Sequence, residues 1–264
     1  ASCHMVLEHS TGLLPDSYLI NAKALQEYYY PIEQDPNMDH EVKFKHMEDW
    51  VNKHNELFMT SGLTANIINT AVDNSIKDGK FRVRDGIKEL FTTMKNNNIP
   101  CLIFSAGITN VLESALKISL SSSIVSTSTI STDGEVDGDD VNATVLSDNV
   151  NIISNRCLFD DADAKGNGKL VGFSTPVLHV YNKSCVNEFL IKNNHFTINT
   201  INRKYNNILL FGDSLGDIKM SHGLENHTII NNIIKIGFLN DKYKCNDQLN
   251  TYLSESNYDI VIFN

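Results

Sequence analysis

Two aspartates four residues apart are the most informative chemical feature of the sequence. Asp213 and Asp217 occur in the string LLFGDSLGD, directly after an apolar run that ends at Gly212. If this run is a parallel strand, both carboxylates lie at its carboxyl end, which is where α/β sheets bind ligands. Paired carboxylates beside glycines suit a hard cation such as Mg²⁺. A surface loop that uses Gly and Asp only to turn the chain is the alternative interpretation.

A hydroxyl group and a lysine suggest phosphate binding. Ser105, Ala106 and Gly107 follow the apolar run Ile99–Phe104 and precede a helical pattern, and backbone N–H groups at a helix N-terminus attract anions. Lys183, in the polar string HVYNKS, could neutralise the charge of a phosphate. Taken singly, a serine at this place is more commonly a helix cap, and such a lysine is more commonly a solvated surface residue.

Short apolar runs predict the strands that position these residues. The runs cover residues 99–104, 149–154, 207–211, 233–239 and 259–263. A helical pattern over residues 109–118 follows the first run. Strands that alternate with helices imply an α/β fold with an open, mostly parallel sheet that carries helices on both faces.

The first third of the chain is predicted to be helical. Apolar residues recur near a 3.6-residue period in four segments, about residues 16–30, 39–61, 67–78 and 84–96. Pro31 is expected to end the first segment, because a proline ring cannot continue the hydrogen-bond ladder of a helix.

A polar segment interrupts the α/β part of the chain. Residues 119–147 are rich in Ser, Thr and Asp and poor in large apolar side chains. Such a segment buries too little apolar surface to offset its ordering entropy, so we predict a disordered or poorly packed insertion. The predicted organisation is a helical domain over residues 14–83 and an α/β core over residues 84–264 that contains the insertion.

In their order along the chain, the strand-end serine, the lysine and the GDxxGD loop resemble the motifs of the haloacid-dehalogenase-like phosphohydrolases. Further strings are similar to those of the cytosolic 5′-nucleotidase III family, the pyrimidine 5′-nucleotidases. They are YYPIEQDP (Tyr29–Pro36), HMEDW (His46–Trp50), NNIPCLIFSAGI (Asn97–Ile108), YNK (Tyr181–Lys183), ILLFGDSLGD (Ile208–Asp217) and IKIGFLND (Ile234–Asp241). The resemblance implies a Rossmannoid parallel sheet with residues 14–83 as an inserted helical cap.

The resemblance also implies a role for each matching residue in hydrolysing a nucleoside 5′-monophosphate, with a pyrimidine base expected. Asp213 would bind Mg²⁺, and Asp217 would support that site directly or through water. Ser105 and Ala106 would hold the phosphate through a hydroxyl and a backbone N–H. Lys183 would neutralise the phosphate and the developing charge of the transition state.

Three cap residues are implied on the nucleoside side. Glu33 would contact the base or sugar, and Trp50 would offer a stacking surface, although an aromatic residue on the apolar stripe of a helix is more often part of a core. His54 stands where the family carries a small residue such as Ser or Ala, so the base preference is left open.

The motif that carries the family's nucleophile is missing from the sequence. The family mechanism needs a DxDxT string after the first strand, where one aspartate attacks phosphorus to form an aspartyl-phosphate and the other acts as acid and base. Before Leu14 there is only ASCHMVLEHSTGL, without an aspartate or an apolar strand. The strings DAD at 161–163 and DGD at 137–139 mimic half of the motif, but a polar hairpin tip explains both better.

Two explanations are open. The sequence is a fragment of a longer enzyme whose catalytic N-terminal strand is missing here, or the protein is a pseudoenzyme that binds a nucleotide without hydrolysing it. We favour the fragment, because a sheet without its central strand would leave backbone groups unpaired.

Composition argues against several other classes of protein. A net charge of −10 over 264 residues does not suit nucleic acid or an anionic membrane surface as a partner. No run approaches the roughly 18 apolar residues of a membrane span, and the first residues lack the layout of a signal peptide. The five scattered cysteines contain no CxxC pair, so we expect reduced thiols in a cytoplasmic protein. Nothing in the sequence indicates an oligomeric state.

Overall fold

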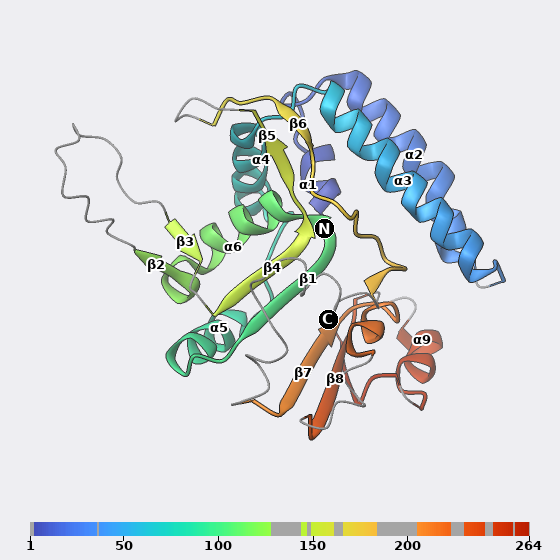
Figure 1. Ribbon diagram of the computed structural model, residues 1–264, viewed down its shortest axis with the longest axis vertical. Helices are drawn as coiled ribbons and strands as arrows, with labels where there is room; N and C mark the ends of the chain where they lie inside the picture. The colour runs from blue at the N-terminus through green and yellow to red at the C-terminus, as the bar shows by residue number, and fades with distance from the viewer. Residues whose placement is uncertain are drawn as a thin grey trace. The chain divides into compact units, whose positions relative to one another are not determined.

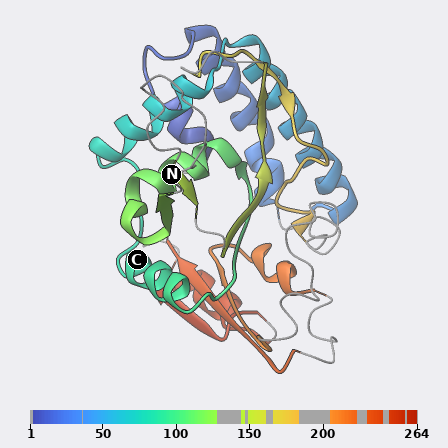
Figure 2. The same cartoon turned by 60° about the vertical axis from the view of Figure 1, so that its left-hand side comes forward.

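The computed structural model describes residues 3–35, 37–127, 144–146, 149–160, 166–183, 205–222, 230–240, 245–255 and 257–263. The chain divides into two compact units, Ala1–Leu178 and His179–Asn264. Figures 1 and 2 draw the elements in chain order from blue to red. Residues 14–83 lie in the first unit together with residues 84–178. The role of residues 14–83 as a cap stays a prediction.

The first unit opens with helices. They are α1 (Cys3–Glu8), α2 (Asp16–Gln34), α3 (His40–Thr60), α4 (Ala65–Lys77) and α5 (Ile87–Asn96). The predicted helices over residues 39–61, 67–78 and 84–96 are confirmed to within three residues. α3 begins where the Asp39 carboxylate accepts hydrogen bonds from the N–H groups of Glu41 and Val42, as an N-cap does. Among the described residues, no helix is long and apolar enough to cross a membrane.

The expectation that Pro31 ends the first helix is wrong. α2 continues through Pro31 for another three residues to Gln34. The carbonyl that a residue-31 N–H would have bonded belongs to Glu27, which is exposed, so water can satisfy it. The extra turn places Glu33 on α2, and α2 packs along α3.

The strands of the first unit follow α5. They are β1 (Cys101–Ile108), β2 (Val125–Thr127), β3 (Thr144–Leu146), β4 (Val150–Asn155), β5 (Cys157–Phe159) and β6 (Leu170–Phe173). β1 and β4 are parallel as predicted, with Cys101 opposite Val150, and their register shifts between Phe104 and Ile108. The two remaining pairs, β2 with β3 and β5 with β6, are antiparallel.

Part of the segment predicted to be a disordered insertion, residues 119–147, forms regular structure. α6 (Thr109–Ile124) extends six residues past the predicted helical pattern, and residues 125–127 and 144–146 pair as strands. Their Val and Thr residues are β-branched and favour extended backbone. Residues 128–143 lie outside the described part of the chain, so the prediction of disorder stays untested there.

The second unit is built on a parallel sheet. Its elements are β7 (Asn207–Gly212), the 3₁₀-helix η2 (Asp217–Ser221), β8 (Asn232–Leu239), α9 (Cys245–Tyr252) and β9 (Ile260–Phe263). The strand order is β7-β8-β9, and all pairs are parallel, as the sequence predicts. The core of this unit joins Leu210 and Leu239 to Ile218, Tyr252 and Tyr258.

Candidate active site

The structure brings the predicted Lys183 and Asp217 together. The Lys183 ammonium donates a hydrogen bond to Asp217 Oδ1, and their side chains are only 12% and 6% exposed. Asp217 Oδ2 accepts hydrogen bonds from the backbone N–H groups of Asp213 (2.9 Å) and Ser214 (3.0 Å). Both oxygens of Asp217 are therefore engaged by protein donors.

Asp213 differs from Asp217 in its surroundings. It lies one residue beyond the carboxyl end of β7 and is exposed, and its Oδ2 accepts a hydrogen bond from Asn240 Nδ2 at 3.2 Å. Asn240 was missed by the sequence reasoning. The signal that could have found it is its position directly after β8, the strand next to β7.

The carboxylates of this turn differ in their fit to Mg²⁺. Among the described residues, no group of three or more His, Cys, Asp and Glu side chains could hold a metal ion. Mg²⁺ needs fewer protein ligands, because it keeps several waters and is commonly bound by one or two carboxylates together with substrate phosphate. The exposed carboxylate of Asp213 fits such a ligand. Asp217 fits indirect support better than direct binding, since protein donors occupy both of its oxygens.

The predicted phosphate-binding residues lie in the first unit, where the register of β1 and β4 shifts. Ser105 Oγ accepts a hydrogen bond from the Gly107 N–H at 3.1 Å. The carbonyl of Ala106 accepts from Asn155 Nδ2 at 3.0 Å, and that of Gly107 from Ser154 Oγ at 2.7 Å. Side chains at the end of β4 therefore hold the backbone of residues 106 and 107. β1 ends at Ile108, and α6 begins at the next residue, Thr109.

Gly107 is required by a close contact. A Cβ atom at this position would lie 2.6 Å from Cys3 Sγ, which belongs to α1. Burial raises the pKa of the Cys3 thiol, so the neutral thiol packs against Gly107.

The two predicted base-side residues Glu33 and Trp50 lie on α2 and α3. Burial is the largest influence on the Glu33 carboxyl group and raises its pKa. Lys43 Nζ donates to the Glu33 backbone carbonyl at 3.1 Å. The half-buried Trp50 stacks on Tyr29 with ring centroids 5.7 Å apart and planes 14° from parallel. A stacking role toward a base stays a prediction for Trp50.

His54 is a buried residue of the first unit. It is 5% exposed, and its ring centroid lies 4.6 Å from that of His4 and 4.8 Å from that of Phe58. Its Nε2 lies 3.1 Å from the Tyr18 hydroxyl, in hydrogen-bond contact. Burial lowers the pKa of His54 to about 3, which keeps the ring neutral. These contacts explain why a side chain as large as that of His54 fits at this position. Contact between His54 and a substrate remains a prediction.

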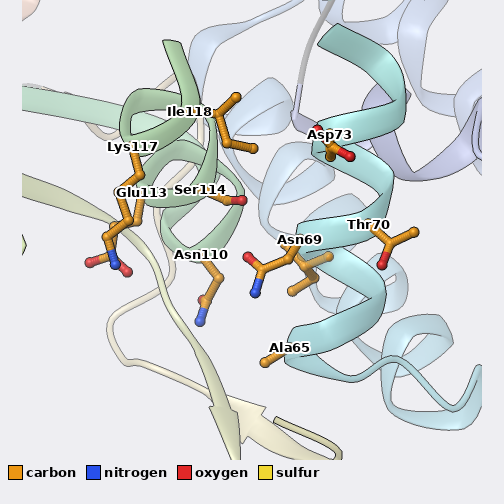
Figure 3. A pocket seen from close by; sticks show the side chains of 10 residues that line it. Ala65, Asn69, Thr70, Asp73, Asn110, Glu113, Ser114, Lys117 and Ile118 are labelled. Carbon is orange, nitrogen blue, oxygen red and sulfur yellow. The ribbon is translucent and has the colours of Figure 1, made fainter. Parts of the chain in front are cut away.

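A pocket of about 580 Å³ lies between α4 and α6, and Figure 3 shows the side chains around it. None of the predicted site residues lines it. Its acidic residues are already paired with neighbours, Asp73 with Lys77 and Glu113 with Arg156. The pocket therefore contributes nothing to the assignment of function.

Comparison with known proteins agrees with the motifs. A family model described as pyrimidine 5′-nucleotidase (UMPH-1) matches residues 1–139 and 140–264. The 7-methylguanosine phosphate-specific 5′-nucleotidase A of Xenopus laevis is 32% identical over 261 residues, which is 99% of this chain and 74% of that protein. The putative cytosolic 5′-nucleotidase 3 of Caenorhabditis elegans is 30% identical over 238 residues, or 90% of this chain and 52% of that one.

A solved structure shares the fold. The crystal structure of cytosolic 5′-nucleotidase IIIB bound to cytidine aligns with a TM-score of 0.70 at 25% identity, covering 97% of this chain and 71% of that chain. The resemblance seen in the sequence is thereby confirmed. The chain belongs to the pyrimidine 5′-nucleotidase family, whose members are phosphoric monoester hydrolases with a haloacid-dehalogenase-like fold.

Proposed function

We propose that the protein is a Mg²⁺-dependent 5′-nucleotidase, which hydrolyses a pyrimidine nucleoside 5′-monophosphate to nucleoside and phosphate. The observation that carries the proposal is the set of Lys183, Asp217 and Asp213 at the carboxyl end of β7. A largely buried ammonium group is held there by one carboxylate, beside a second carboxylate that is exposed.

Each residue contributes a different part of the chemistry. Lys183, oriented by Asp217, supplies a fixed positive charge for the oxygens of a phosphoryl group. Asp213 would hold Mg²⁺, and the bound ion would neutralise negative charge on the phosphate. Asp217 keeps the Asp213 backbone in place. In the first unit, Ser105 Oγ and the backbone of Ala106 are assigned to phosphate binding.

The base is the least determined part of the substrate. The family description supports a pyrimidine, and the related structure holds cytidine. The Xenopus laevis relative is named for 7-methylguanosine phosphate, which makes that nucleotide the competing substrate.

A cytoplasmic location is supported by the name of the Caenorhabditis elegans relative, a putative cytosolic enzyme. The net charge of −10 argues against nucleic acid as a partner.

A second function is favoured by one observation. The 264 residues contain no DxDxT string, and hydrolysis through an aspartyl-phosphate requires the aspartate of that motif. The alternative is that these 264 residues, as a fragment or as a pseudoenzyme, bind a nucleotide without hydrolysing it.

Phosphate release separates the two functions. CMP, UMP and 7-methyl-GMP are each incubated with the 264-residue chain and with a longer chain that adds a DxDxT strand, in Mg²⁺ and in EDTA. We expect release by the longer chain in Mg²⁺ only, and fastest from CMP or UMP. Nucleotide binding by both chains without release from either would establish the alternative and refute the nucleotidase.

A further inference from the structure

Two tyrosines of the second unit contact the turn that carries Asp213. Tyr252, the last residue of α9, donates a hydrogen bond from its hydroxyl to the backbone carbonyl of Asp213 at 2.7 Å. Tyr258, which precedes β9, donates in the same way to the carbonyl of Ser214 at 2.5 Å. Neither tyrosine belongs to the motifs found in the sequence, and both lie about forty residues further along the chain.

The tyrosines add to the hydrogen bonding of this turn. Asp217 Oδ2 accepts from the N–H groups of Asp213 and Ser214, and the two phenol groups donate to the carbonyls of the same two residues. The Ser214 carbonyl also accepts from the Asp217 N–H at 3.1 Å. The backbone of both residues is therefore held through its N–H and its carbonyl groups, and Asp213 is an exposed residue.

A pair of glycines makes room for this arrangement. Gly212 and Gly237 are register partners on β7 and β8. A Cβ atom at Gly237 would lie 2.7 Å from Cγ of Tyr258, and one at Gly212 would lie 2.5 Å from the Tyr258 hydroxyl oxygen. The two missing side chains leave the space in which the Tyr258 ring lies across both strands.

The tyrosines are buried and stacked. They are 8% and 3% exposed, and their ring centroids lie 5.3 Å apart. A phenol has an ordinary pKa of about 10, so both hydroxyls are donors at neutral pH.

We propose that Tyr252 and Tyr258 are positioning residues, whose hydroxyls fix the carbonyls of Asp213 and Ser214 and so set the direction in which Asp213 presents its carboxylate to a divalent cation. The inference rests on the proposed function, since that function assigns the cation to Asp213. Neither tyrosine touches the substrate in this scheme. Their effect is transmitted through the backbone of the turn.

The test removes one hydroxyl at a time. Tyr252→Phe, Tyr258→Phe and the double variant keep the packed rings and lose only the hydrogen bonds. Tyr28→Phe, at a tyrosine of α2 that is 60% exposed, is the matched control. Mn²⁺ serves as the spectroscopic probe for Mg²⁺, and its binding to the 264-residue chain is titrated by electron paramagnetic resonance.

Loss of one net hydrogen bond predicts that the Mn²⁺ dissociation constant rises about two- to tenfold in each single variant and further in the double variant. Hydrogen exchange of the peptide covering residues 207–222 should become faster in the same variants, while the β8 peptide of the same unit exchanges as in the wild type. A general loss of stability would accelerate exchange everywhere and would not produce this local pattern.

The outcomes separate the inference from the proposed function. Wild-type binding of Mn²⁺ that is unchanged in the tyrosine variants would overturn the positioning role and leave the metal assignment intact. Binding that is weakened by Asp213→Asn but not by Tyr28→Phe, and that is weakened by both tyrosine variants, would support both. A wild-type chain that binds no Mn²⁺ would instead refute the metal assignment, and with it the cation-directing role of the tyrosines.

Discussion

Lys183 and Asp217 form a largely buried ion pair, in which Asp217 Oδ1 accepts from the lysine while Oδ2 accepts from two backbone N–H groups. One carboxylate thus holds both the cationic side chain and the turn that carries Asp213. Asp217 bonds to the lysine and to the turn, whereas Lys183 bonds to Asp217. Substituting the two residues should therefore lower the free energy of unfolding by unequal amounts.

Asp217→Asn is expected to destabilise the protein more than Lys183→Met. Removing one member of a buried pair typically costs about 3–5 kcal/mol, because a charge is left buried without its partner. Asp217→Asn leaves the ammonium group without its carboxylate and weakens two charge-assisted bonds to the turn, whereas Lys183→Met leaves a carboxylate that still accepts two N–H bonds. Urea unfolding followed by circular dichroism measures both. Equal free-energy losses would contradict the dual role of Asp217.

Asp213→Asn is expected to abolish Mg²⁺-dependent phosphate release in a longer chain that carries a DxDxT strand. The fold should be nearly unaffected, because the side chain is exposed and surface substitutions usually change stability by less than about 0.5 kcal/mol. Asp78→Asn, an exposed aspartate after α4, is the matched control and should retain full activity. Normal turnover by the Asp213 variant would remove this residue from the metal site.

Local signals made much of the fold predictable. The 3.6-residue period identified α3, and short apolar runs identified β7, β8 and β9 of the second unit. Pro31 was misread, because a proline near the end of a helix removes only one backbone hydrogen bond and the helix can continue for one more turn. The ends of the polar segment were misread because β-branched residues there pair as strands.

The residues of the candidate site could be picked out where they lie near the ends of apolar runs. Asp213, Asp217 and Ser105 carry such a signal, since the chain places each of them at or near the end of an apolar run. Tyr252 and Tyr258 carry none, because their contacts with the Asp213 turn depend on how α9 and β9 pack against β8. Such contacts arise from tertiary structure and leave no periodic trace.

Gly237→Ala is expected to destabilise the second unit. The new methyl group would lie 2.7 Å from Tyr258 Cγ, the ring atom nearest the backbone, which cannot move without the whole ring. Overpacking of this kind costs about 1–3 kcal/mol. Gly172→Ala is the matched control, since nothing lies within 4 Å of a Cβ atom at that strand glycine. Thermal unfolding compares the two. A Gly237→Ala protein as stable as the control would show that Tyr258 does not occupy this space.

Acid is expected to destabilise the first unit through His54, which is buried, and His4, which is half-buried. Burial lowers the pKa of His54 to about 3 and that of His4 to about 4, from 6.5 in the unfolded chain. A lowered pKa means that the unfolded state binds protons first, so this contribution to stability is full above pH 6.5 and is lost as the pH falls toward 4. Glu8, whose Oε1 lies 3.9 Å from His54 Nε2, acts in the opposite sense because burial raises its pKa.

A His54→Phe variant isolates this effect. Phenylalanine keeps a ring in the core but cannot bind a proton, so the difference in unfolding free energy between pH 7 and pH 5 should shrink relative to the wild type. Urea titrations at the two pH values can follow the fluorescence of Trp50, the single tryptophan of the chain, which lies on α3 with His54. His222→Gln, at an exposed histidine of the second unit, is the control and should keep the wild-type pH dependence. An unchanged pH dependence in His54→Phe would show that His54 does not supply the acid sensitivity, because the variant removes its only titrating group.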